Sequence, residues 1–509
     1  MESNVSIPAQ LNDAFGKELT ENVARTNTDF LQKLLPRERF PFPINEELLR
    51  KLSTTTPSQI GLNEPIWNGP KSCFHRPPTV DSKEAAVCEW LNNIGMTMGL
   101  VYGRQCKRLW WSGRCRPLVA SFIQQKPDLV LLDRDYYEKL AQKDFADTGW
   151  AFVKAVAEVH QPNTPTEAPR SYLTFLCQPH RRFTISLSFF VAKKSQFSVA
   201  VIDRVGQIRI AHMDLTEPLL ENGLLLLSVL ALLMFGSPED VGLDPHFEIN
   251  PLNGQIATVE CGNRRFKVLK RIHALPVLFG RGTQVWVVSH NGIRYIMKDS
   301  WVREDRNNNE VMHLHRILTH NELKGRVPTL ICGGDVVING FKDSTQHYQT
   351  ARCTHRIHRR IVTSPVGEPI TSFKTKKEFI RVLISIIESK STYLWSDSDS
   401  TYGPWFIAHR YLHNHVGILH CDLSPNNILL NRENDELEAI GLLIDYDYSI
   451  NTEAASHQAP QHTMDRDCKP NTFHTYAIDT TGDVVAQRVP GVIEHSLEAQ
   501  SMPASRTVC

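Results

Sequence analysis

Several features that would assign this chain quickly to a class are missing from its sequence. The eleven cysteines form no Cys-x-x-Cys pair and no zinc-finger spacing, which argues against a compact zinc site. The first eleven residues show no basic region followed by an apolar stretch, so we expect no secretory signal. Scattered cysteines without such a signal indicate reduced thiols, and we expect a cytoplasmic or nuclear location.

Long apolar runs and a strong net charge are also missing. The longest apolar run, Leu224 to Phe235, is interrupted by Ser228 and is shorter than the roughly 20 residues that cross a membrane. We therefore expect a buried helix there and no membrane span. The formal net charge is only +1, so the overall balance predicts no nucleic-acid partner. The sequence also contains no internal repeats. Nothing in the residue order indicates the oligomeric state.

The 509 residues present are enough for two or three domains. We expect a polar lead-in, helical or partly disordered, over residues 1–80, and an α/β domain over residues 81–245. A second domain is expected over residues 265–450, and an irregular tail over residues 451–509. The apolar patterns predict strands, helices and turns as follows: a helix over 84–94, strands over 129–132, 183–191, 197–202, 266–278, 285–289, 294–297, 428–430 and 442–444, tight turns at 203–206 and 290–292, and helices over 310–318 and 378–388.

The most informative motif is His420-Cys421-Asp422-Leu423-Ser424-Pro425-Asn426-Asn427. Phosphoryl transfer needs a carboxylate for the acceptor hydroxyl and ligands for metal ions over the phosphates. Asp422 and Asn427, five residues apart in a polar loop, fit both needs. The apolar run 442–444 then ends at Asp445, where a carboxylate suits Mg²⁺. Asp447 is either a second ligand or a structural substitute for glycine.

Upstream residues complete the set that a kinase uses. Gly280-Arg281-Gly282-Thr283 joins two apolar strands, and its glycines let backbone N–H groups approach phosphates, although two glycines also suit a simple turn. Lys298 lies on the following strand and Glu310 in the next helix, the usual pair that holds ATP phosphates. Each residue alone has a purely structural explanation. Their common order favours a phosphotransferase.

These motifs resemble the fungal-type protein kinase family. The resemblance rests on Phe279 to Thr283, Met297-Lys298-Asp299-Ser300-Trp301, Arg360-Ile361-Val362, Ile418 to Leu429 and Ile444 to Ser449, with Lys126-Pro127-Asp128 and Asp203 to Gly206 upstream. It covers roughly residues 80–450. It implies an α+β, two-lobed protein-kinase-like fold, preceded by the α/β domain, which uses ATP and Mg²⁺ to phosphorylate Ser/Thr of protein substrates.

The resemblance also implies individual roles. Asp422 would be the catalytic base, and Asn427 and Asp445 the metal ligands. Lys298 would contact the α/β-phosphates and pair with Glu310, while Gly280, Arg281, Gly282 and Thr283 would cover the nucleotide. A hinge between residues 361 and 368 would contact adenine through its backbone groups.

The chain departs from the kinase pattern in three places. Cys421 replaces an arginine that often receives an activation-loop phosphate, so we expect that form of control to be missing. Residues 391–406 look like an insertion in the helix that supports the catalytic loop. Nothing after Ile450 resembles the rest of a C-lobe, so we expect a truncated C-lobe, which an unspliced intron or a frame-shifted gene model would explain.

Three alternatives therefore stay open. The missing C-lobe favours a catalytically impaired pseudokinase or a truncated binding protein. Ser424, in place of a lysine common in Ser/Thr kinases, is compatible with a small-molecule phosphotransferase of the aminoglycoside or choline kinase type. In the first domain, Asp128, Glu158 and His160 faintly resemble the acid pairs of restriction-endonuclease-like folds. A scaffold or partner-binding role is the preferred interpretation of that domain.

Overall fold

The computed structural model describes part of the chain. The described residues are 23–26, 40–79, 82–112, 127–141, 149–160, 173–191, 195–210, 212–274, 279–305, 309–347, 354–387, 408–432, 439–452, 476–478 and 484–486. They divide into two compact units. The first comprises Met1–Arg306 with Cys332–Val362, and the second Asn307–Ile331 with Thr363–Cys509.

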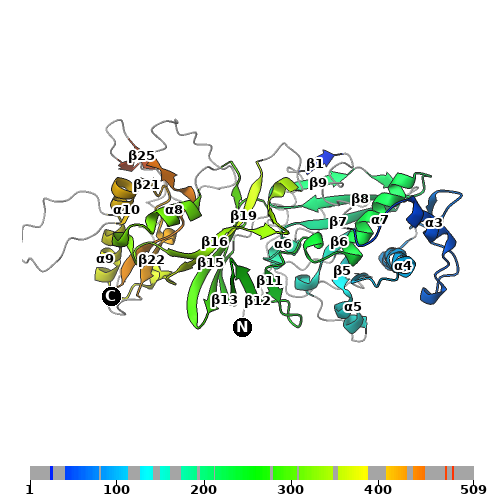
Figure 1. The fold of residues 1–509 in the computed structure, drawn as a ribbon, viewed down its shortest axis with the longest axis horizontal. Helices are drawn as coiled ribbons and strands as arrows, with labels where there is room; N and C mark the ends of the chain where they lie inside the picture. Colours follow the sequence, from blue (N-terminus) through cyan, green and yellow to red (C-terminus); the bar gives the residue numbers. More distant parts are fainter. Residues whose placement is uncertain are drawn as a thin grey trace, which may run out of the picture. The chain divides into compact units, whose positions relative to one another are not determined.

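The first unit contains a mixed sheet, here called the N-terminal sheet (Figure 1). Most neighbouring strands are antiparallel, but β6 and β7 are parallel, as are β1 and β9. The strand order is β1 (Val23–Thr26), β9 (Gln207–Ile210), β8 (Ser195–Ile202), β7 (Thr184–Val191), β6 (Ala155–His160), β5 (Leu129–Asp133) and β4 (Arg108–Ser112), with β10 (Met213–Asp214) beside β8. The predicted turn after β8 is confirmed, since Asp203 N donates to Gly206 O at 3.0 Å.

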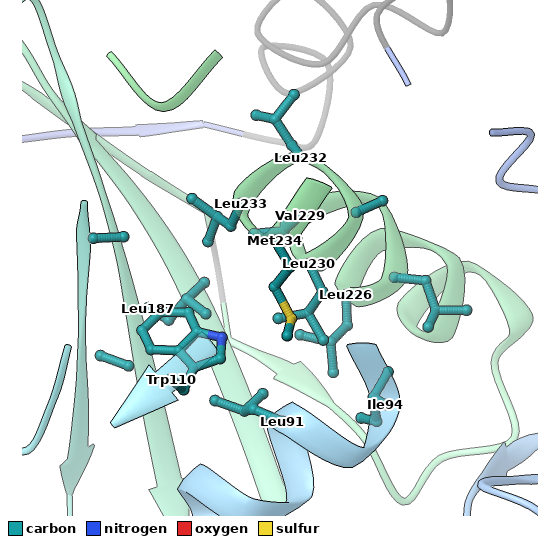
Figure 2. Close-up of a cluster of buried hydrophobic side chains, with 14 of the residues drawn as sticks. Leu91, Ile94, Trp110, Leu187, Leu226, Val229, Leu230, Leu232, Leu233 and Met234 are labelled. Atoms are coloured by element: carbon teal, nitrogen blue, oxygen red, sulfur yellow. The ribbon is translucent and has the colours of Figure 1, made fainter. Parts of the chain in front are cut away.

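Two long helices, α4 (Glu84–Tyr102) and α7 (Leu220–Phe235), cover this sheet with their apolar side chains. Figure 2 shows leucines of α7 meeting Leu91 and Ile94 of α4 near Trp110. The helices touch at Gly95, where a Cβ would lie 2.3 Å from the Met234 methyl group. Both expected helices are confirmed, and the run 224–235 is buried in a core rather than in lipid. None of the described helices is long and apolar enough to cross a membrane.

Part of the expected lead-in belongs to this folded body. Helix α3 (Glu46–Thr54) is capped by Asn45, whose side chain accepts from Leu48 N, and it buries Leu48, Leu49 and Leu52 in the same core. The remaining elements here are short: β2 (Trp67–Asn68), β3 (Cys73–Phe74), α5 (Arg134–Ala141) and α6 (Leu173–Cys177). The leucines of α3 supply apolar area that stabilises the sheet domain.

A second sheet, here called the kinase-like sheet, begins in the same unit. Its order is β11 (Phe247–Ile249), β12 (Ile256–Cys261), β13 (Arg264–Ala274), β14 (Gln284–His290), β15 (Ile293–Arg303), β19 (Arg356–Ser364) and β16 (Thr329–Asp335). The hairpin from β14 to β15 turns at Asn291 and Gly292, both at positive φ as the Asn-Gly pair predicts. Strands β17 (Val337–Ile338) and β18 (Phe341–Lys342) form a small hairpin.

The second unit contains helices and short antiparallel strands. Helix α9 (Lys376–Ile387) packs on β23 (Ile440–Leu443), because Gly441 has no side chain and its N–H donates to Ser385 Oγ at 3.0 Å. The other elements are α8 (Glu310–Ile317), α10 (Ala408–Tyr411), β20 (Glu368–Pro369), β21 (Ile418–Leu419), β22 (Ile428–Asn431), β24 (Ile450–Asn451), β25 (Tyr476–Ile478) and β26 (Val484–Ala486). The expected insertion 391–406 and most of the tail lie outside the described residues.

Candidate active site

The loop between β21 and β22 holds Asp422 and Asn427 against each other. Asn427 Nδ2 donates to both the backbone carbonyl and the carboxylate Oδ2 of Asp422, each at 2.9 Å. Pro425 starts the short 3₁₀ turn that ends at Asn427 and leads into β22. The spacing of five residues thus folds one side chain back onto the other. It leaves the amide oxygen of Asn427 as an acceptor for a cation.

His420 ties this loop to the strand that carries Asp445. The ring is fully buried, and its Nδ1 accepts from Asp422 N at 3.3 Å. The hydrogen therefore sits on Nε2, which donates to the carbonyl of Ile444 at 3.0 Å. The backbone adds a second tie, since Ile444 N donates to Asn427 O at 2.9 Å. Asp445, just after β23, is consequently held beside the loop that carries Asp422 and leads into the paired strand β22.

Two residues of this region have left-handed backbone angles that non-glycine residues seldom adopt. Cys421 has φ +61° and Asp445 has φ +68°. Such conformations cluster at functional sites, where the surrounding structure compensates their cost. Burial raises the pKa of the Cys421 thiol to about 11, so this residue is a neutral neighbour of Asp422. It has no charge with which to receive a phosphate group.

Asp445 lies in a group of three carboxylates. One oxygen each from Glu310, Asp445 and Asp447 lies within 4.8 Å of the others. Glu310 and Asp447 are buried, and Glu310 Oε1 accepts from Tyr446 N at 3.2 Å. Glu310 begins α8 directly after its capping residue Asn309. Because close carboxylates repel each other, a cation between them is favourable.

The oxygen donors here suit Mg²⁺. Magnesium binds carboxylate and amide oxygens and usually keeps several waters. Asp445 and Asp447 offer carboxylates. Asn427, whose backbone carbonyl accepts from Ile444 N, would add the amide oxygen that its hydrogen bonds to Asp422 leave open. These residues therefore fit the metal that the sequence motif implies.

Sequence reasoning missed His313 and Ser449, which join helix α8 to this site. His313 Nε2 lies 3.1 Å from the carbonyl of Ser449, and Ser449 Oγ donates to His420 O at 3.3 Å. Burial lowers the pKa of His313, so the ring is neutral and donates to that carbonyl. The available signal was the i, i+3 spacing of Glu310 and His313, which puts both on one helix face.

The other predicted nucleotide-binding residues lie in the first unit. Lys298 is half-buried on β15, opposite Val285 of β14, and residues 280–283 precede β14. Glu310 belongs to the second unit, so its pairing with Lys298 stays a prediction. In the N-terminal sheet, Asp128 Oδ2 accepts from Val159 N at 2.7 Å, a structural contact. Within the described ranges, the only group of three or more His, Cys, Asp or Glu side chains close enough to share a metal ion is the one around Asp445.

A family model described as fungal protein kinase matches residues 126–354, 342–396 and 405–480, more than half of the chain. The chain belongs to the fungal protein kinase family. This confirms the resemblance inferred from the motifs, and the mixed α+β fold agrees with it. The matched range includes Asp422, Asn427, Asp445, Lys298 and Glu310, whose individual roles stay predictions.

Solved structures similar to this fungal protein kinase family member include two kinase domains. One is the BubR1 kinase domain, 16% identical, with a TM-score of 0.25 over 42% of this chain and 53% of that one. Another is the Cydia pomonella granulovirus kinase PK-1, 13% identical, with a TM-score of 0.21 over 36% and 55%. The chain thus spans about half the length of these domains. A search of curated proteins found no match.

Proposed function

We propose that this protein is an ATP- and Mg²⁺-dependent Ser/Thr protein kinase with Asp422 as its catalytic base. The observation that carries the proposal is the hydrogen bond from Asn427 to the Asp422 carboxylate, together with the bond from Ile444 N to Asn427 O, which holds the residue before Asp445 beside this pair. A carboxylate beside metal-bound phosphates orients and deprotonates an acceptor hydroxyl. Family membership supports the same chemistry.

Each residue has a defined part in this proposal. Asp422 accepts the proton of the substrate hydroxyl, and its bond from Asn427 Nδ2 keeps the carboxylate oriented. Asp445 and Asn427 hold Mg²⁺, which neutralises charge on the phosphates when it is bound. Lys298 and the turn 280–283 contact the nucleotide. We propose the cytoplasm or the nucleus as the location, because every cysteine among the described residues is a free thiol.

The test compares three full-length proteins: wild type, Asp422→Asn and Asp445→Asn. Binding of ATP with and without Mg²⁺ is measured by calorimetry, and transfer by radiolabelled phosphate on Ser/Thr protein substrates. We expect Asp445→Asn to lose Mg²⁺-dependent ATP binding. We expect Asp422→Asn to keep binding but to transfer about 10² to 10⁴-fold more slowly, the usual contribution of a general base.

The outcomes separate the competing functions. A folded wild type that binds no Mg²⁺-ATP would contradict every phosphotransferase interpretation. Binding without transfer to any acceptor would identify a pseudokinase or nucleotide-dependent binding protein. Transfer to small hydroxyl compounds but not to protein would instead indicate the small-molecule class. Equal phosphoryl-transfer rates for wild type and Asp422→Asn would show that Asp422 is not the catalytic base.

A further inference from the structure

The two sheets of the first unit are joined by buried polar contacts. Arg182, just before β7, forms a bidentate pair with Asp343 of the kinase-like sheet region, at 2.8 and 3.0 Å. Gln284, the first residue of β14, donates through Nε2 to Pro179 O at 3.1 Å. Buried bidentate pairs fix relative orientation as well as distance. These contacts therefore fix the orientation of the following strands relative to the N-terminal sheet.

Around the Arg182–Asp343 pair lies a group of six buried charged residues, here called the charge cluster. Its members are the acids Asp244, Asp299 and Asp343 and the bases Arg182, His358 and Arg360. Arg360 Nη2 contacts Asp244 at 2.6 Å and Asp299 at 3.1 Å. His358 contacts Asp343 at 3.0 Å through Nδ1 and Asp299 at 2.9 Å through Nε2.

The charge cluster balances when His358 is protonated. Burial disfavours the charged ring, but the carboxylates of Asp299 and Asp343 outweigh this effect and raise the pKa of His358 to about 9. Within these six residues, three positive and three negative groups then face each other away from water. Two further basic groups act on the same acids, since His246 Nδ1 lies 2.7 Å from Asp244 Oδ1 and the buried Arg204 guanidinium interacts with Asp299. Removing one partner would leave an uncompensated buried charge, so the six residues hold their places together.

The charge cluster lies directly behind the residue predicted to contact the phosphates. Asp299 follows Lys298 on β15, and neighbouring side chains of a strand point to opposite faces. Asp299 thus reaches into the cluster while Lys298 occupies the other face. Two residues further, Trp301 stacks on the His358 ring with 4.6 Å between centroids and 5° between planes. Asp299 and Trp301 therefore anchor this stretch of β15 on the face opposite Lys298.

The segment 279–283, here called the glycine turn, is held by the N-terminal sheet as well. Gly280 N donates to Arg204 O at 2.8 Å, and Arg281 O accepts from Trp301 N at 2.8 Å. Gly282 has φ +48°, and a Cβ there would lie 2.7 Å from the guanidinium carbon of Arg204. A side chain at this position would need both the strained positive φ and a shift of the Arg204 guanidinium.

Arg204 is itself fixed in the body of the N-terminal sheet domain. It is buried, and its guanidinium lies 4.8 Å from the centre of the Phe175 ring. Phe279, at the start of the glycine turn, is buried in one apolar cluster with Phe175 and Ile202. The cavity left beside Arg204 and Gly282 is about 10 Å³, room for a single water. The contact is therefore tight packing and not an open cleft.

We propose that the N-terminal sheet positions the nucleotide-binding elements of this kinase, with Arg204 as the positioning residue for the glycine turn and the charge cluster as the support for Lys298. The inference rests on the proposed function and adds a role for the first domain. When the phosphate-binding groups are already held in place, the affinity for ATP rises, because fewer groups lose conformational freedom as the nucleotide binds. Arg204 acts through the glycine turn and does not touch the nucleotide.

The test uses Arg204→Lys in the full chain, which keeps the positive charge but removes the planar group under Gly282. The control is Arg76→Lys, whose side chain is 83% exposed and pairs with Glu64 at the surface. We expect the KM for ATP to rise about fivefold or more while kcat stays within about twofold, the pattern of lost binding without lost chemistry. The control should match wild type in both.

A measurement on wild type removes any dependence on folding of the variant. Hydrogen exchange is followed with and without Mg²⁺-ATP, and we expect added protection in the glycine turn and in residues 203–206 of the N-terminal sheet domain. Protection confined to the kinase-like sheet would overturn the inference, as would unchanged or tighter ATP binding by folded Arg204→Lys. Absence of ATP binding by wild type would instead overturn the proposed function and this inference with it.

Discussion

At the scale of single residues, the site depends on left-handed backbone conformations, and the type of side chain decides how much free energy they cost. Asp445 takes a left-handed conformation at the end of β23, and the carboxylates of Glu310 and Asp447 lie nearby. Aspartate and asparagine accept this region more readily than other residues with a Cβ, because their short polar side chains bond locally. Position 445 is therefore constrained both as a ligand and as a turn.

Two substitutions at this position separate these constraints. Both Asp445→Asn and Asp445→Ala remove the carboxylate, so each relieves the same repulsion and should lose Mg²⁺-dependent ATP binding. Only alanine also loses the preference for left-handed angles. We expect Asp445→Ala to be less stable than Asp445→Asn by about 1 kcal/mol, measured by urea unfolding. Equal stability of the two variants would contradict the conformational argument.

The residue scale also shows where sequence reasoning succeeded. Asp422, Asn427 and Asp445 were recognisable because their spacing within short loops already determines which groups meet. The contact of Glu310 with Tyr446 N was not recognisable, since 136 positions separate the two residues. Only the packing of α8 against the turn after β23 brings them together.

At the scale of elements, α7 shows how an apolar run is used inside a protein. Leu226, Leu230 and Leu233 are fully buried, and in Figure 2 they lie among side chains of α4 and β4. The run predicted a buried helix, and its length excluded a membrane span. Which face would meet which neighbour was not predictable, because this helix is apolar on every side.

We expect Leu230→Ala to destabilise the first unit by about 2 to 5 kcal/mol, the usual cost of a cavity at a fully buried leucine. Chemical denaturation monitored by tryptophan fluorescence measures this change. The matched control is Leu252→Ala, whose side chain is 85% exposed and should change stability by less than about 0.5 kcal/mol. Similar losses for both variants would show that α7 is not the core of this unit.

At the scale of the whole molecule, the charge cluster makes stability depend on pH. The folded protein raises the pKa of His358 above its ordinary value of 6.5, to about 9. Its stabilisation is therefore complete below about pH 6.5 and is lost as pH rises through 9. Asp244, Asp299 and Asp343 act in the opposite direction, since their lowered pKa values make their contribution disappear in acid.

We expect the melting temperature of wild type to fall between pH 6.5 and 9, corresponding to about 3 kcal/mol at about 1.4 kcal/mol per pKa unit. Arg182, Arg360 and the three aspartates keep their charges over this range, whereas burial lowers the pKa of Arg181 to about 9. The difference between wild type and a His358 variant therefore isolates His358. His358→Gln should be less stable at pH 6.5 and should lose most of this slope. A slope that persists in His358→Gln would assign the titration to another group.

The sequence by itself determined the family, the mixed α+β class, most strands and helices, and the loop that pairs Asp422 with Asn427, because these follow from local periodicity and short spacings. Tertiary structure alone decided the rest. Arg182, Asp244, Asp299, Asp343, His358 and Arg360 are spread over 179 positions, and no local pattern marks them as partners. These six residues come together because the packing of the two sheets buries their charged groups in one place. A buried charge is stable only when it is paired with a charge of opposite sign.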